Sequence, residues 1–172
     1  MRTFHWVSGE LTEVQRFINV PMRWCEQYPA RERRELWIQS TGGIELKLVV
    51  HTRAMPARRG HRVLAVLHRR QLVGLRNLSI GAQVNFVRSD PPLLWRRCDG
   101  AALATLIVVS AGLALADLPL AAIAWLAAAS LGVPTLVGAR LIARVLLARA
   151  VESALDTAAQ QAASRPAIRR VK

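Results

Sequence analysis

Short apolar runs of strand length, separated by polar turn residues, make up most of the first 92 positions of this chain. The runs at 34–40 and 43–50 flank Thr41-Gly42-Gly43, a turn sequence between β-rich segments that predicts a β-hairpin. Further strands are predicted at 61–68, 71–77 and 82–87. Five or six short strands in under a hundred residues are typical of a small meander that closes into a barrel or sandwich.

The start of the chain leaves two alternatives open. Phe4 and Trp6 alternate with His5 as in a strand, whereas the apolar positions after them are spaced three and four residues apart, as in a short helix. These later positions are Leu11, Val14, Phe17 and Ile18. The charged, proline-containing stretch 19–34 is either a surface loop or a short helix, and it is the part of this region that we expect to be mobile or to face a partner. Trp6 and Trp37 are expected to fill the core of so small a domain.

From residue 100 to residue 139 the pattern changes to an apolar run with a single charge, Asp117. A membrane span needs about 20 apolar residues, and this run holds two such stretches, at about 100–116 and 118–139. The turn between them, Asp117 to Pro119, is too short for anything but a tight connection. We therefore predict a transmembrane helical hairpin over 96–139. Small residues recur four apart at Gly112/Ala116 and Ala128/Gly132; they either close this hairpin or form an oligomer seam.

After the hairpin, residues 140–163 continue without a helix breaker. From about 147 onward, polar side chains fall on one face of the predicted helix and apolar side chains on the opposite face. Such an amphipathic helix docks on the preceding domain, lies along the membrane surface, or pairs with another chain; the sequence leaves these three alternatives open. The end, 164–172, is predicted to be a basic disordered tail that stays near anionic headgroups.

The predicted fold class is therefore an α+β membrane protein. An N-terminal, mostly-β domain (1–95), an SH3-like or OB-like meander or barrel, is followed by the two-helix hairpin and the C-terminal amphipathic helix.

Charge gives the predicted hairpin an orientation. Residues 1–97 carry 17 Arg and Lys, residues 98–139 carry none, and residues 140–172 carry 7, which together account for the 24 in the chain. The positive-inside rule then places both termini in the cytoplasm and Asp117 on the opposite side of a cell inner membrane. The interface residues expected from this pattern are Trp95, Arg96 and Arg97 before the first span, and Arg140 and Arg144 after the second.

The residue types offer no recognisable chemistry. The sequence has no glycine-rich phosphate loop followed by lysine, and no paired carboxylates in an apolar setting, so we predict no catalytic residue and no cofactor. The four histidines, His5, His51, His61 and His68, are spread over separate predicted strands, which argues against a metal site. The start of the sequence lacks the apolar run of a signal peptide, and Cys25 and Cys98 are expected to be reduced.

The arginine content, 22 Arg against 2 Lys, has two interpretations. The first is a solvated surface that is attracted to anionic lipids. The second is nucleic-acid binding, which is disfavoured because the cluster Arg53, Arg58, Arg59 and Arg62 contains no aromatic residue for base stacking.

Two short segments are similar to the signature of PilZ domains, which is RxxxR followed by [D/N]xSxxG. Arg58 and Arg62 satisfy the first motif, and Asn77 to Gly81 follows the second except that its glycine comes one position early. The resemblance implies cyclic-di-GMP binding, with Arg58, Arg62, Asn77 and Ser79 as the contacts.

Taken together, these patterns predict a non-catalytic inner-membrane accessory or scaffold protein. Its expected partners are the lipid bilayer and either another protein or a second copy, which would bind through the 1–95 domain and the 140–163 helix. The alternatives are a cytoplasmic cyclic-di-GMP sensor and a nucleic-acid-binding domain on a membrane anchor.

Overall fold

A computed structural model describes residues 3–21, 32–40, 42–116 and 118–164. The described residues divide into two compact units. The first unit, called the head below, comprises residues 3–21, 32–91 and 146–164; the second, called the hairpin, comprises residues 92–145. One long helix contributes residues to both units. Asp117 and the predicted tail beyond Ser164 lie outside the described residues, as do Trp24 and Cys25 in the 19–34 stretch.

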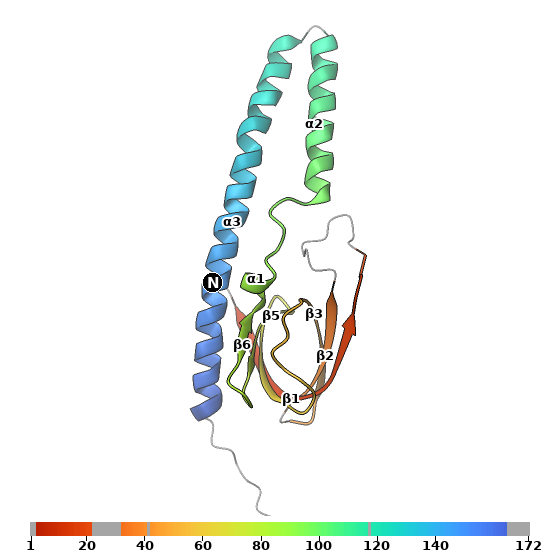
Figure 1. The fold of residues 1–172 in the computed structure, drawn as a ribbon. Coiled ribbons are helices and arrows are strands. Elements are labelled where there is room, and N and C mark those ends of the chain that lie inside the picture. The colour runs from red at the N-terminus through yellow and green to blue at the C-terminus, as the bar shows by residue number, and fades with distance from the viewer. Residues whose placement is uncertain (1–2, 22–31, 41, 117, 165–172) are drawn as a thin grey trace, which may run out of the picture. The chain divides into compact units, whose positions relative to one another are not determined.

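The head contains a six-stranded antiparallel sheet, curved as Figure 1 shows. Its strands are β1 (Phe4–Phe17), β2 (Arg33–Ser40), β3 (Glu45–His51), β4 (Arg62–His68), β5 (Gln71–Asn77) and β6 (Gln83–Asn85). They are ordered β3-β2-β1-β4-β5-β6 in the sheet. The mostly-β character of this domain is thus confirmed, and its SH3-like or OB-like assignment stays a prediction.

The sequence left open whether residues 11–18 form a strand or a short helix. Strand β1 is extended over Phe4–Phe17, and no helix forms over 11–18. Its first half pairs with β4 and its second half with β2, with Gly9 paired to both strands. A side chain at Gly9 would lie only 2.2 Å from the carbonyl oxygen of Gln39, so this crossing point requires glycine. A register shift between Leu11 and Glu13 changes the alternation of the strand, and this irregularity produces the helix-like spacing of apolar residues.

The last predicted strand is shorter than expected. Strand β6 ends at Asn85, and Phe86–Ser89 forms the short helix α1. The side chain of Asn85 accepts a hydrogen bond from the backbone N–H of Val87 at 3.1 Å. This cap satisfies a backbone donor at the start of the helix and ends the strand there.

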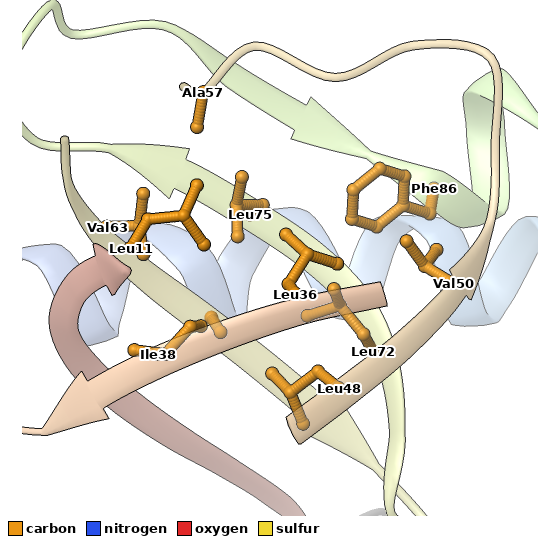
Figure 2. Packing of buried hydrophobic residues seen from close by; sticks show 11 residues of the cluster. Leu11, Leu36, Ile38, Leu48, Val50, Ala57, Val63, Leu72, Leu75 and Phe86 are labelled. Atoms are coloured by element: carbon orange, nitrogen blue, oxygen red, sulfur yellow. The ribbon is translucent and has the colours of Figure 1, made fainter. Parts of the chain in front are cut away.

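Apolar side chains from every long strand fill the interior of the curved sheet (Figure 2). This inner cluster consists of Leu11, Leu36, Ile38, Leu48, Val50, Ala57, Val63, Ala65, Leu72, Leu75 and Phe86. Trp37, expected in the core, is not part of it, because it lies between the inward-facing Leu36 and Ile38 and therefore points to the other face of β2. There the ammonium group of Lys47 lies 4.9 Å from its ring centroid.

A second hydrophobic cluster lies on the opposite face of β4 and β5, where the end of the long helix α3 (Pro119–Ser164) packs. This outer cluster consists of Leu64, Val66, Val73, Val87, Val151, Leu155 and Ala158, with Phe4 and Trp6 packed against it. The two strands are consequently buried on both faces. Of the three alternatives for the amphipathic helix, the structure shows docking on the preceding domain.

Polar contacts fix this helix on the sheet at several points along its length. The side chain of Asn85 donates to the carbonyl oxygen of Ala148 at 2.8 Å, and the guanidinium of Arg88 lies 3.0 Å from the Glu152 carboxylate. At the far end of the helix, Trp6 Nε1 donates to Gln161 Oε1 at 3.1 Å. These contacts define the register of the helix on the sheet, which the apolar contacts alone would leave less specific.

The hairpin contains α2 (Arg97–Leu115) and the first part of α3. Both helices are long and apolar enough to cross a membrane, and only 6% of each apolar window is buried within the protein. The predicted span at 100–116 matches α2 to within three residues at each end. The predicted span at 118–139 begins within one residue of α3, which continues beyond 139 to Ser164. Pro134 lies inside α3 without ending it.

Candidate functional site

Three neighbouring arginines form the most concentrated group of unpaired cations in the head. Arg58, Arg59 and Arg62 are exposed and, within the described part of the chain, none of them forms an ion pair. They lie at the end of the loop 52–61 and the start of β4, next to the turn 77–82. We call the three arginines together with residues 77–82 the arginine corner.

Hydrogen bonds join the two segments that carry the PilZ-like motifs. The backbone N–H of Arg62 donates to Ser79 Oγ at 2.9 Å, and the N–H of Leu78 donates to the carbonyl oxygen of Arg62 at 2.8 Å. Residues that are 17 positions apart in the sequence are therefore direct neighbours. The backbone of Arg62 and the side chain of Ser79 are thus in contact, and their binding of a ligand stays a prediction.

Asn77 has a different place from the one that the resemblance implies. Its side chain is fully buried, and Nδ2 donates to the carbonyl oxygen of Pro56 at 2.9 Å. The same nitrogen lies 2.7 Å from His61 Nδ1, and Oδ1 accepts from the backbone N–H of Ser79 at 2.9 Å. Asn77 thus holds the loop 52–61 against the turn 77–82, whereas Arg58, Arg62 and Ser79 are exposed.

Two glycines with positive φ shape this corner. Gly60 has φ +83° and Gly81 has φ +76°, and a side chain at either position would meet no atom within 4 Å. The requirement is therefore conformational, since residues with a Cβ rarely adopt this backbone region. Gly81 is the glycine that comes one position early relative to the PilZ motif. Here it forms the turn, and its N–H donates to the carbonyl oxygen of Asn77.

Other arginines of the head are neutralised by acidic side chains. Arg16 donates two hydrogen bonds to Glu32, at 2.9 and 3.1 Å, and Arg34 lies 3.7 Å from the same carboxylate. The hydrogen bond from Arg16 lowers the pKa of Glu32 below its usual range. Arg33 and Lys47 both contact the Glu35 carboxylate, at 3.1 and 2.6 Å. These cations are consequently less available to an anionic ligand than those of the arginine corner.

At the base of the hairpin, the predicted interface residues have specific partners. Arg140 binds Asp99 through both of its terminal nitrogens, one of them at 3.0 Å, and also donates to the carbonyl oxygen of Leu94 at 2.8 Å. The Asp99 carboxylate also accepts the backbone N–H of Arg96 at 2.7 Å and so caps α2. Arg140 therefore joins α3 to the start of α2.

Three further predicted interface residues have less defined surroundings. Trp95 and Arg97 are exposed and Arg144 is half-buried. Their positions at the two ends of the hairpin sequence are compatible with a lipid interface, and their contact with lipid stays a prediction. Asp117, the predicted residue of the opposite side, lies outside the described residues.

The glycines of the small-residue pairs are not closely packed within one chain. A side chain built at Gly112 or at Gly132 would meet no atom within 4 Å. The interpretation that these glycines close the hairpin by close helix contact is therefore not supported. Neither glycine is needed for space in the described structure.

The histidines are not assembled into a metal site. Among the residues that the structure describes, no group of three or more His, Cys, Asp or Glu side chains is placed to hold a metal ion. His61 contacts Asn77 of the arginine corner, and His68 lies near Phe4 with ring centroids 5.1 Å apart. Cys98 is a free thiol.

Two important residues were not identified from sequence. The sequence patterns did not single out Asp99, although its position three residues after Arg96 is the position from which a carboxylate caps a helix. His61 lies inside the RxxxR motif, but the sequence offered no signal for its contact with Asn77. Neither a family model, nor a curated protein, nor a solved structure matches this chain.

Proposed function

We propose that this protein is a non-catalytic accessory or scaffold protein of a cell inner membrane. In this role the hairpin spans the bilayer and holds the head on the cytoplasmic side, where it binds a protein partner or a second copy of the chain. The observation that supports a membrane location is the exposed apolar surface of the hairpin. Leu115 and Leu120 are 88% and 81% exposed, and many other apolar side chains of both helices are also uncovered.

Lipid is the simplest cover for such a surface. The 19 residues of α2 extend about 28 Å at 1.5 Å per residue, close to the roughly 30 Å of a hydrocarbon core. Helices form their backbone hydrogen bonds within the segment, which an apolar solvent demands, and Pro134 removes one such bond from α3. The C-terminal part of α3 differs, because its apolar side chains Val151, Leu155 and Ala158 are covered by the sheet.

The proposed orientation follows from the arginines at the two ends of the hairpin and the lack of basic residues between them. A reporter that is active only outside the cytoplasm should be active when fused at Asp117 and silent when fused at Lys172. Activity at Lys172 would contradict a two-span topology with both termini inside.

The scaffold role is supported by exposed apolar side chains on the part of the head that α3 does not cover. Ile44 is 71% exposed at the turn between β2 and β3, and Val49 on β3 is 43% exposed. The docking of α3 uses the apolar stripe of the amphipathic helix within the chain. Partner contacts are therefore expected on β2 and β3 rather than on that stripe.

Photo-crosslinking in cells tests this role. A crosslinking amino acid at Val49 should capture a defined partner or a second copy, whereas one at the exposed Arg149 of α3 serves as the matched control. A protein that remains monomeric in mild detergent and yields no specific product from Val49 would contradict the scaffold proposal.

A second candidate function, cyclic-di-GMP sensing, is favoured by one specific observation. The two PilZ-like segments, far apart in sequence, are hydrogen-bonded to each other through Arg62 and Ser79. Guanidinium groups bind phosphate oxygens well, and the unpaired Arg58 and Arg62 supply two of them. In this proposal Asn77 positions the two segments and does not touch the ligand.

Calorimetric titration of cyclic-di-GMP into the full chain in detergent tests the second candidate. The variant Arg58→Ala/Arg62→Ala should abolish binding, and Arg69→Ala/Arg70→Ala, which removes the same charge from the β4–β5 turn, should leave it unchanged. No binding by the unmodified chain, or equal losses in both variants, would remove this candidate.

A further inference from the structure

We infer that His61 is a proton-sensitive latch of the arginine corner: neutral His61 holds the part of the loop 52–61 that carries Arg58 against the turn 77–82, and protonated His61 releases it. The inference rests on the second candidate function only for its effect on ligand binding. The latch itself follows from hydrogen-bond chemistry at Asn77.

The orientation of the Asn77 amide is fixed by two groups that have a single possible role. The backbone N–H of Ser79 is only a donor, so the atom that it contacts at 2.9 Å is the amide oxygen. The carbonyl oxygen of Pro56 is only an acceptor, so the atom at 2.9 Å from it is the amide nitrogen. The second hydrogen of that nitrogen then points to His61.

His61 must therefore accept this hydrogen at Nδ1, at a nitrogen–nitrogen distance of 2.7 Å. A neutral imidazole accepts at one nitrogen and carries its proton on the other, which here is Nε2. The backbone N–H of Arg58 also faces Nδ1, at 3.5 Å. An imidazolium carries N–H groups at both positions, so protonation would set two donors against each other beside a fully buried amide.

Asn77 cannot relieve this conflict by turning its amide over. A flipped amide would place its NH₂ against the Ser79 N–H and its oxygen against the Pro56 carbonyl, and both existing bonds would be lost. The remaining solution is movement of the His61 ring away from Asn77, which also removes its contact with the Arg58 N–H, while the bond from Asn77 to Pro56 holds the earlier part of the loop. The backbone bonds of Leu11 to His61 and to Gly60 keep the end of this loop on β1, so the change is local.

The charged groups around His61 are Arg58 and Arg59 on its own loop, Arg62 at the start of β4, and Glu10 of β1, whose backbone is aligned with that of Arg62 in the sheet. Protonation adds a fourth positive charge to the corner. Charge alone would therefore strengthen the binding of an anion at low pH. The latch predicts the opposite, because its release separates Arg58 from Arg62 and Ser79.

His68 provides an internal control. Its Nδ1 lies 3.3 Å from the carbonyl oxygen of Thr3, so this nitrogen donates and the neutral ring has the opposite tautomer. Protonation of His68 adds a proton at Nε2 and leaves the bond to Thr3 intact. Both rings are followed in the same pH series, so one experiment compares the two residues.

The test is ¹⁵N NMR of the histidine rings in the full chain in detergent micelles, from pH 8 to pH 5. We expect the Nε2–H tautomer at His61 and the Nδ1–H tautomer at His68, and we expect the Ser79 amide signal to shift with His61 protonation only. His61→Asn, which keeps an acceptor near the position of Nδ1, should remove the pH response, and His68→Asn should preserve it. An Nδ1–H tautomer at His61, or protonation without a change at Ser79, would overturn the latch.

Ligand titration separates the latch from the proposed sensing function. If cyclic-di-GMP binds, its affinity should fall by about fivefold on release of the latch, the equivalent of one neutral hydrogen bond, and His61→Asn should abolish the fall. Tighter binding at low pH would contradict the latch. Absence of binding would refute only the sensing function, because the tautomer measurement needs no ligand.

Discussion

At the scale of single residues, Gly74 determines how closely α3 approaches the sheet. A side chain built at Gly74 would lie 3.0 Å from Leu155 Cδ1 and 3.0 Å from Val151 Cγ1. Glycine is unfavourable inside a strand by about 0.5–1 kcal/mol relative to alanine, so its presence at this point reflects the close approach of the helix. The packing of Val151 and Leu155 in the outer cluster therefore depends on the absence of a side chain at this one position of β5.

Enlarging Gly74 should therefore destabilise the head. Gly74→Val overpacks the contact with Val151 and Leu155, and we expect a loss of about 1–3 kcal/mol in the free energy of unfolding. Thermal unfolding of the purified chain, followed by circular dichroism of the β-domain, measures this effect. The matched control is Gly42→Val, where a side chain meets no atom within 4 Å. Equal stability of the two variants would contradict a tight helix–sheet contact.

The turn between β4 and β5 stores backbone strain in two arginines. Arg69 and Arg70 have φ values of 50° and 64°, a left-handed conformation that two-residue hairpin turns need and that Asn-Gly adopts readily. Replacing Arg69-Arg70 by Asn-Gly should stabilise the head by about 1 kcal/mol. Denaturant unfolding checks this gain against Ala-Ala, which removes the same charges and keeps the strain. A gain equal in both variants would show that charge repulsion, and not strain, was relieved.

At the scale of secondary-structure elements, the ion pair between Asp99 and Arg140 connects the two helices of the hairpin. Its side chains are 12% and 23% exposed, and Arg140 uses both terminal nitrogens. A two-point, partly buried pair is stronger than an exposed one, and the removal of one partner leaves the other charge poorly solvated. Arg140 is therefore expected to fix α3 to the start of α2 in addition to any contact with lipid.

A double-mutant cycle of Asp99→Asn and Arg140→Gln tests this connection. Each single variant should lower the resistance of the hairpin to unfolding in a denaturing detergent, and the double variant should lose much less than the sum. We expect a coupling energy of about 1–3 kcal/mol. The control is Arg144→Gln one turn further along α3. Additive effects would mean that the two side chains act independently, for example through lipid headgroups.

At the scale of the whole molecule, the head is assembled from segments on both sides of the hairpin. Strands β4 and β5 have apolar side chains on both faces, and the outer face is covered by residues 147–162 of α3. A fragment that ends at residue 95 would therefore expose Leu64, Val66 and Val73 to water. The predicted boundary of the first domain at residue 95 describes the sequence order, whereas the compact unit includes residues 146–164.

Truncation of the chain before or after the docked part of α3 tests this arrangement. A stop codon after Arg144 should leave the hairpin able to insert but should destabilise the head, with rapid proteolysis of residues 3–91 in membranes. The control is a stop codon after Ser164, which removes only residues 165–172 and keeps the outer cluster. Full protease resistance of the shorter protein would show that the sheet is stable without α3.

The local patterns of the chain determined its elements. The turn Thr41-Gly42-Gly43 and the apolar runs around it identified the β2–β3 hairpin, and the forty-residue apolar run identified two helices long enough to cross a membrane. These features depend on the periodicity and length of continuous segments, which are visible without any contact between distant residues. The strand at 11–17 was ambiguous because a β-bulge interrupts its alternation.

Only the tertiary structure decided which surfaces meet. By sequence, the amphipathic helix could dock on the preceding domain, lie on the membrane or pair with another chain. In the structure it packs on β4 and β5, which are buried on both faces, and Gly74 leaves room for its close approach. Arg140 and Asp99, like His61 and Asn77, are each polar residues with many possible partners, and their pairing depends on geometry between distant segments. The sequence thus determined where helices and strands form, because that depends on local pattern. Long-range packing determined which face of the helix is covered and that the Asn77 amide of the arginine corner is buried.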